Sequence, residues 1–174
     1  MRGNRRAAGL TLGPAIRVQI DVVSAVMILI GSTARDHLSI TISRWLIDEP
    51  DNPVDAAWLV SEIEIAAGPF RGRFETQLRR EDVVSWRDDL ALLDREFRPG
   101  LARFSPTLEH AVVFVVTVGN TGALSVDGWA APAIGSAAKQ RLEFSFPIDQ
   151  SVRELLTPVE AYLHGFHDRA EGLE

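Results

Sequence analysis

The feature that most limits the fold of this chain is an alternation of apolar and polar side chains with a period of two. Leu38, Ile40 and Ile42, for example, are separated by a serine and a threonine. This alternation is typical of a β-strand that buries one face and exposes the other to water. From it, and from apolar β-branched runs, we predict strands over residues 27–30, 38–43, 58–65, 70–78, 101–104, 111–118, 124–129 and 142–148.

Two of these strands, 58–65 and 70–78, are separated by a turn containing Gly and Pro and are expected to form an antiparallel hairpin. Glu62 and Glu64 fall on the wet face of the first strand, where an acid needs no catalytic role. In the strand at 124–129 the apolar phase changes after Gly128, which predicts a β-bulge at that residue.

Helical periodicity replaces this alternation in two places. Apolar residues recur at three- and four-residue spacing between 80 and 97, which predicts an amphipathic helix built on Val83, Trp86, Leu90, Leu93 and Phe97. Near the C-terminus, Ser151 and Glu154 fit a capping box. A proline inside a helix costs about 3 kcal/mol. Because of Pro158, we therefore expect a short helical turn at 150–156 and a separate main helix at 158–166.

The order of strands, helix, strands and helix defines the expected fold class. It favours an α+β fold with a mostly antiparallel sheet of about six to eight strands and two helices packed on one face. We expect a single domain over 27–166, with a flexible or upstream N-terminal extension at 1–26 and a tail at 167–174. Met27 is then a candidate for the natural start. A signal peptide is the alternative for the N-terminal segment, although Asp21 just before the apolar run argues against it.

Motifs that carry chemistry are not apparent. The chain has no cysteine, which excludes disulfides, thiolate nucleophiles and zinc–cysteine sites. It also lacks the phosphate-binding, dinucleotide-binding, zinc-protease and serine-hydrolase signatures. His164 and His167 are spaced to share a helix face, but two ligands do not make a metal site. We therefore predict no catalytic residue, no cofactor and no metal, and hence a protein that is not an enzyme.

The charge of the chain limits its partners. It carries 18 basic and 24 acidic residues, a formal net charge of −6. Such a protein has no general attraction to nucleic acid, whereas a basic protein partner is compatible with it. The apolar run at 22–30 is too short for a membrane span. We take the acidic loop at 48–56 and one flank of the 80–97 helix as the candidate partner-binding surface, made of Asp48, Glu49, Asp51, Asp55, Asp82, Asp89 and Glu96. The alternative for the helix is an ordinary solvated face.

A family resemblance rests on scattered positions. The loop DEPDNPVDAAWL at 48–59 leads straight into a strand, and the strand at 70–78 and the helix containing Trp86 follow. The segment FSFPIDQ at 144–150 then precedes LLTP at 155–158. Over residues 27–165 this order resembles that of WapI-type immunity proteins, and also a neighbouring uncharacterised bacterial family. The chain departs from the family pattern at 43–47, where an aromatic-rich strand is usual, and at Gln150-Ser151, where Gln-Thr is usual.

The resemblance implies a cytoplasmic antidote that binds the toxic C-terminal domain of a polymorphic toxin and blocks its active site. Toxin domains of this kind are often basic, which agrees with the acidity of the chain. Two other hypotheses remain open at this point. One is a small-ligand-binding or structural module, which requires a deep apolar pocket with convergent polar groups. The other is a hydrolase, which requires buried, converging carboxylates or histidines.

Overall fold

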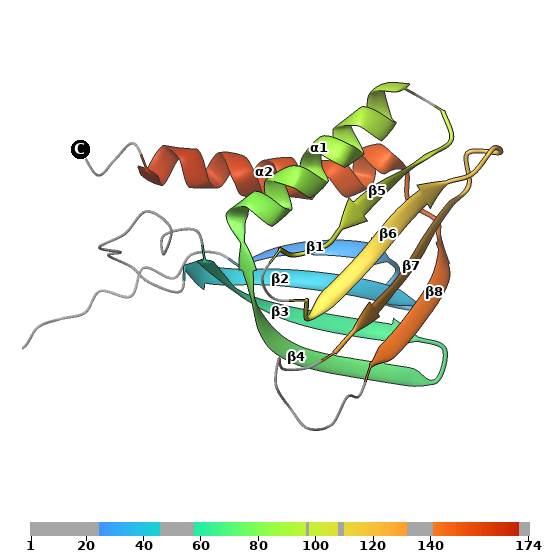
Figure 1. Cartoon of the computed structure of the whole chain (residues 1–174), viewed down its shortest axis with the longest axis horizontal. Helices are drawn as coiled ribbons and strands as arrows, with labels where there is room; N and C mark the ends of the chain where they lie inside the picture. Colours follow the sequence, from blue (N-terminus) through green and yellow to red (C-terminus); the bar gives the residue numbers. More distant parts are fainter. Residues whose placement is uncertain (1–24, 46–57, 97, 108–109, 132–140, 171–174) are drawn as a thin grey trace, which may run out of the picture.

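The computed structural model describes residues 25–45, 58–96, 98–107, 110–131 and 141–170. Within them the chain forms eight strands and two helices, drawn in Figure 1. In chain order these are β1 (Val26–Gly31), β2 (His37–Trp45), β3 (Trp58–Ala67), β4 (Phe70–Arg79), α1 (Arg80–Glu96), β5 (Gly100–Phe104), β6 (Val112–Val118), β7 (Leu124–Ala130), β8 (Leu142–Ile148) and α2 (Val152–Ala170).

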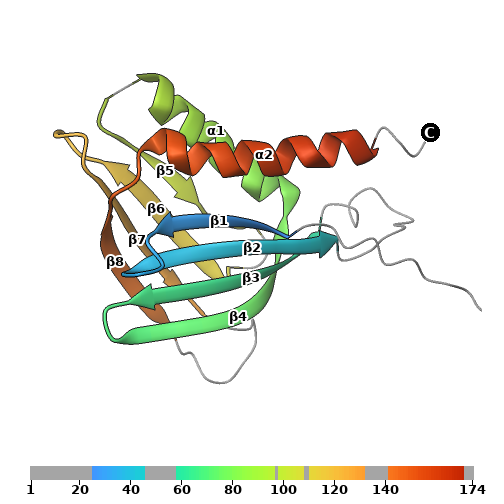
Figure 2. The same cartoon turned by 180° about the vertical axis from the view of Figure 1, so that it is seen from behind.

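The strands form two antiparallel sheets of four strands each, with the orders β1-β2-β3-β4 and β5-β6-β7-β8. The β5–β8 sheet lies in front of the other sheet in Figure 1 and behind it in Figure 2, so the two sheets face each other. Both helices lie along the same side of this pair of sheets. The expected α+β fold, mostly antiparallel sheet with two helices, is confirmed. The strands are divided between two sheets, a division that alternation within single strands does not specify.

One hydrophobic core connects both sheets and both helices. At its centre the indole of Trp86 on α1 meets the rings of Phe104 and Phe114 edge-on, with centroids 5.7 and 5.2 Å away. These two phenylalanines stack on each other at 5.0 Å. Aromatic pairs in such geometries add attraction beyond the area that they bury. The predicted core role of Trp86 is confirmed, and this residue joins α1 to β5 and β6.

The predicted strand faces agree with the structure. In β2, Leu38, Ile40 and Ile42 are buried. In β3, Ile63 is buried, whereas Glu62 and Glu64 on either side of it are half-buried on the opposite face. The expected hairpin of 58–65 and 70–78 is present as β3 and β4, with Ala67 paired to Phe70 across a two-residue loop. A register shift in β2, between Ile42 and Arg44, interrupts the otherwise regular pairing of this sheet.

The predicted bulge at Gly128 is wrong. Gly128 pairs in regular register with Phe114 on one side and Phe144 on the other. A Cβ atom at this position would lie 2.7 Å from Phe114 Cβ and 2.8 Å from Phe144 Cζ. Glycine is therefore required by the close approach of two aromatic side chains to the backbone. The alternation continues through Gly128, so that Trp129 faces outward, where the Arg141 guanidinium lies 4.4 Å from its ring centroid.

The expected break before Pro158 is also wrong, because α2 is one helix from Val152 to Ala170 with the proline inside it. The Thr157 hydroxyl donates a 2.8 Å hydrogen bond to the Arg153 carbonyl, in the turn where the proline lacks an N–H. The predicted capping box is present, since Ser151 N–H donates to Glu154 Oε2 at 2.7 Å and Glu154 N–H donates to Ser151 Oγ at 3.2 Å. Helix α2 also extends past residue 166, where we expected it to end.

Candidate functional site

The acidic residues of α1 occupy quite different environments. The helix begins at Arg80 directly after β4, and its apolar stripe of Val83, Trp86, Leu90 and Leu93 is buried against the core. Six acids and three arginines give this helix a formal charge of −3. A helix that buries one stripe exposes the opposite face, and most of these charges lie there.

Asp82 is not part of the exposed flank on which we placed it. Its side chain is buried, with an exposed fraction of 9% for the residue. Its Oδ2 accepts the Arg79 N–H at 3.2 Å, and its Oδ1 accepts both the backbone N–H and the hydroxyl of Thr107, at 3.1 and 2.7 Å. Asp82 therefore caps the start of α1 and fastens the segment after β5 to it. This carboxylate has a structural role that its spacing in the sequence did not indicate.

Asp89 and Glu96 remain near the surface but already have partners. Asp89 Oδ2 accepts the backbone N–H of Arg103 at 3.1 Å, which ties α1 to β5. Glu96 Oε2 lies 2.5 Å from Arg98 Nε in an ion pair. Seven-residue spacing does not keep Asp82, Asp89 and Glu96 equivalent, because Asp82 lies in the first turn, where the unpaired backbone N–H groups attract it inward.

The other acids of α1 are also paired with arginines. Glu81 lies 3.3 Å from Arg79, Asp88 lies 2.7 Å from Arg87, and Asp94 on α1 lies 3.2 Å from Arg153 on α2. Exposed ion pairs of this kind contribute little stability, and a partner protein can rearrange them at small cost. The outer face of α1 is therefore acidic in sum, but most of its acids have an arginine beside them.

The other residues of the proposed surface belong to the acidic loop at 48–56. Asp48, Glu49, Asp51 and Asp55 lie outside the described part of the chain. Their proposed role in partner binding stays a prediction.

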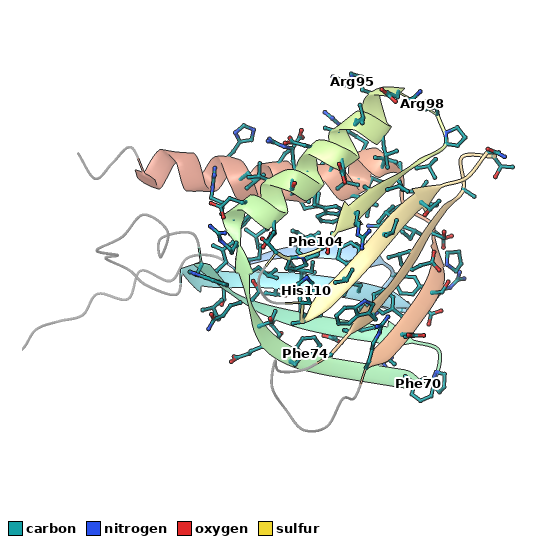
Figure 3. The ribbon with its side chains drawn as sticks, viewed as in Figure 1. Phe70, Phe74, Arg95, Arg98, Phe104 and His110 are labelled. Atoms are coloured by element: carbon teal, nitrogen blue, oxygen red, sulfur yellow. The ribbon has the colours of Figure 1, made fainter. Side chains whose placement is uncertain are left out.

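The carboxylates and histidines that a hydrolase would need form separate pairs in the described part of the chain, and not one cluster. On the outer face of the β1–β4 sheet, Glu62 pairs with Arg73 at 2.6 Å and Glu64 lies 3.6 Å from His37 Nε2. His110 is exposed at the other side of the molecule, next to β6 (Figure 3). Among the described residues there is no group of three or more His, Asp or Glu side chains arranged to hold a metal ion. No helix of this part is long and apolar enough to cross a membrane.

Sequence patterns missed one exposed feature. Phe70 has the same orientation along β4 as the buried Leu78, and alternation assigns both to the same face. However, Phe70 lies at the tip of the β3–β4 hairpin, beyond the edge of the core, and 62% of its surface is exposed. Only the length of the two strands gives a hint of this exposure in the sequence.

The described residues thus define a class of protein: a small α+β protein with two facing antiparallel sheets, in which most charged side chains lie at the surface and pair locally, while Asp82 is buried and hydrogen-bonded. The sequence pattern of the immunity protein WapI-like family matches residues 28–166, most of the chain. The chain therefore belongs to this family, as the resemblance indicated. No curated protein and no solved structure gives a significant match to it.

Proposed function

We propose that this protein is an immunity protein that binds the toxic domain of a polymorphic toxin in the cytoplasm and blocks its activity. The observation that carries the proposal is the family match over residues 28–166. The net charge of −6 supports a basic toxin domain as the partner, because opposite fields accelerate encounter and favour the correct orientation. Neutralisation by binding requires only a tight interface, and no catalytic group is assigned in this chain.

The proposed toxin-binding surface combines the acidic loop, with Asp48, Glu49, Asp51 and Asp55, and the outer face of α1, with Asp89 and Glu96. Asp82 takes a different part in the proposal. Since its carboxylate is buried and accepts three hydrogen bonds, it supports the start of α1 and does not meet the toxin directly.

The test uses the full chain and the toxin domain encoded by the adjacent gene. We expect coexpression to restore growth of cells that produce the toxin domain, and the two purified proteins to form a complex whose affinity falls as salt is added. Failure of the purified proteins to bind each other would remove the proposed function.

The proposed toxin-binding surface is tested separately by substitutions that change its charge. Replacing the four loop acids by Asn or Gln, or Glu96 by Lys, is expected to weaken toxin binding by about tenfold or more, mainly through a slower association rate. Glu143→Lys is the matched control, because Glu143 is an exposed acid on β8 that also has an arginine neighbour. If the control weakens binding as much as Glu96→Lys does, the toxin binds elsewhere, while the immunity function stands.

A further inference from the structure

The two sheets have four edge strands, and three of them are protected. Helix α2 lies along β1, and α1 lies along β5, as both cartoons show. Strand β8 contains Pro147, which removes one backbone donor and is a common way of blunting an edge strand. Within the residues that the structure describes, the fourth edge, β4, has neither protection over most of its length. It pairs with β3 on one side, and α1 meets it at its C-terminal end.

Strand β4 is well formed for pairing with a further strand. It runs for ten residues from Phe70 to Arg79 without a proline and in unbroken register with β3. In an antiparallel ladder every second residue directs its N–H and C=O towards one neighbour, so half of these groups in β4 point away from β3. The tip of the hairpin is fixed, because Gly68 N–H donates to Asp36 Oδ1 at 2.7 Å. A long, exposed and ordered edge of this kind favours association with another strand.

The charges on β4 show a local imbalance. Its outward-facing residues include Arg71, Arg73 and Glu75, all of them exposed. Glu75 lies directly opposite Glu62 of β3, and like charges in this position repel each other. Arg73 pairs with Glu62 at 2.6 Å, and this pairing raises the pKa of its guanidinium. Glu75 forms no ion pair with any described residue and so faces a like charge without a cation of its own.

We infer that β4 pairs antiparallel with β4 of a second copy of this chain, about a two-fold axis at Phe74. In this register Arg73 of each copy lies opposite Glu75 of the other, and Arg71 lies opposite Gln77. Glu75 thereby gains the cation that its own sheet does not provide. The two four-stranded sheets become one continuous sheet of eight strands.

The charges select this register over its neighbours. Moving the axis by one residue towards the hairpin keeps two attractive pairs, between Arg71 and Glu75, but places Arg73 opposite Arg73. Moving it by one residue the other way places Glu75 opposite Glu75 and leaves no Arg–Glu pair. A further step towards the hairpin places Arg71 opposite Arg73. Because like charges opposite each other disfavour strand pairing, the register centred on Phe74 is the favourable one among these. An unrelated strand has no reason to match this pattern, whereas a second copy matches it by symmetry.

The same register covers the apolar side chains of β4. It places Phe70, 62% exposed in the single chain, opposite Leu78 of the second copy, so that this pair newly covers the Phe70 ring, because Leu78 is already buried in its own chain. Phe74, which is half-buried against the core, lies opposite its own counterpart. Figure 3 shows both phenylalanines along β4, Phe70 at its start and Phe74 further along the strand. Apolar cross-strand neighbours of this kind stabilise a new strand pair and remove an exposed aromatic ring from water.

The test is sedimentation equilibrium of the full chain between about 1 µM and 1 mM, the range of dissociation constants expected for a small interface. The wild type should change with concentration from 19.2 kDa to twice that mass. Arg73→Glu and Glu75→Arg should each weaken the dimer by about tenfold or more, since each turns two attractive pairs into repulsive ones. A mass of 19.2 kDa at every concentration would overturn the inference.

Mixing the two variants makes the test specific. In an equimolar mixture, a chain with Glu at 73 and 75 meets a chain with Arg at both positions, so both cross-strand pairs become attractive. The mixture should therefore dimerise at concentrations where each variant alone does not. A mixture that stays monomeric at concentrations where the wild type dimerises, or single variants that dimerise as well as the wild type, would contradict the proposed register. Recovery in the mixture also shows that both variants are folded.

A cysteine placed on the axis provides a second measurement. The chain has no cysteine of its own, so Phe74→Cys introduces a single thiol. Two such thiols on the two-fold axis lie close enough for a disulfide, and mild oxidation should give a covalent dimer. Leu92→Cys, at an exposed position of α1, is the control and should remain monomeric. Equal crosslinking of both variants would contradict the dimer. The result does not depend on the toxin, and failure here leaves the proposed immunity function untouched.

Discussion

Three hydrogen bonds end on the Asp82 carboxylate, from Arg79 N–H, Thr107 N–H and the Thr107 hydroxyl. Asp82→Ala removes the acceptor and leaves buried donors without a partner, so we expect the free energy of unfolding to fall by about 1–3 kcal/mol. Urea unfolding followed by circular dichroism measures this loss. Asp88→Ala, at an exposed position of the same helix, should change stability by less than about 0.5 kcal/mol. Equal effects of the two variants would refute the capping role.

Gly128 supports a second prediction at the scale of one residue. Gly128→Ala brings a Cβ atom within 2.5 Å of the Val113 carbonyl oxygen and close to two phenylalanine side chains, so β7 or the rings must move. Overpacking of this kind typically costs about 1–3 kcal/mol, which thermal unfolding would show as a lower Tm. Gly72→Ala is the matched control in a strand, since its Cβ would meet no atom within 4 Å. A Tm for Gly128→Ala equal to that of the control would contradict the close approach.

For these two residues, spacing in the sequence does not predict the structural role. Asp82 has the same seven-residue spacing as Asp89 and Glu96, but the first turn of α1 offers unpaired N–H groups that later turns lack. Gly128 interrupts the apolar alternation of β7 only because it has no side chain, while its backbone stays in register. In both cases a neighbour distant in sequence, Thr107 or Phe144, decides the role of the residue.

At the scale of one element, the stability of the first turn of α2 is expected to depend on pH. The backbone N–H and hydroxyl of Ser151 donate to the Glu154 carboxylate at 2.7 and 2.8 Å, and these bonds hold its pKa below the ordinary value of 4.5. A lowered folded-state pKa means that the stabilisation is fully present above the unfolded-state pKa. The stabilisation is lost as the pH falls through the folded-state pKa.

Glu154→Gln should therefore lower the Tm at neutral pH, and the difference from the wild type should shrink as the pH falls below 4.5. Differential scanning calorimetry over this pH range measures the effect. Glu160→Gln removes the same charge from the middle of α2 and is the control, because it leaves the capping box intact. A constant difference between Glu154→Gln and the wild type at all pH values would show that the capping box does not form.

Elements were easier to predict than their assembly. Each strand shows its buried face by local alternation, as Ile40 and Ile63 do in β2 and β3, so strands and faces follow from neighbouring residues. The division into two sheets depends on contacts between segments far apart, which alternation does not encode. The predicted break at Pro158 is wrong for a similar reason. Its cost to the helix is offset by packing, since Leu155 and Val159 on either side of it are fully buried.

At the scale of the whole molecule, Gln150 connects the segment before α2 to strand β1. Its Oε1 accepts the Gly31 N–H at 2.7 Å, and its Nε2 donates to the Leu29 carbonyl at 3.1 Å. These bonds join β1, in one sheet, to the segment between β8 and α2, which follows the other sheet. Because one core connects both sheets and both helices, breaking this joint should weaken the whole structure and not one half of it.

Gln150→Ala is therefore expected to lower the free energy of unfolding by about 1–3 kcal/mol while leaving a single cooperative transition. Urea unfolding followed by tryptophan fluorescence and by far-ultraviolet circular dichroism should give coincident curves, shifted to lower urea with an unchanged slope. Gln77→Ala, on the outer face of β4, is the control and should shift the midpoint little, because no described residue accepts or donates a hydrogen bond to its side chain. Two separated transitions in Gln150→Ala would mean that the sheets unfold independently and that the shared core does not couple them.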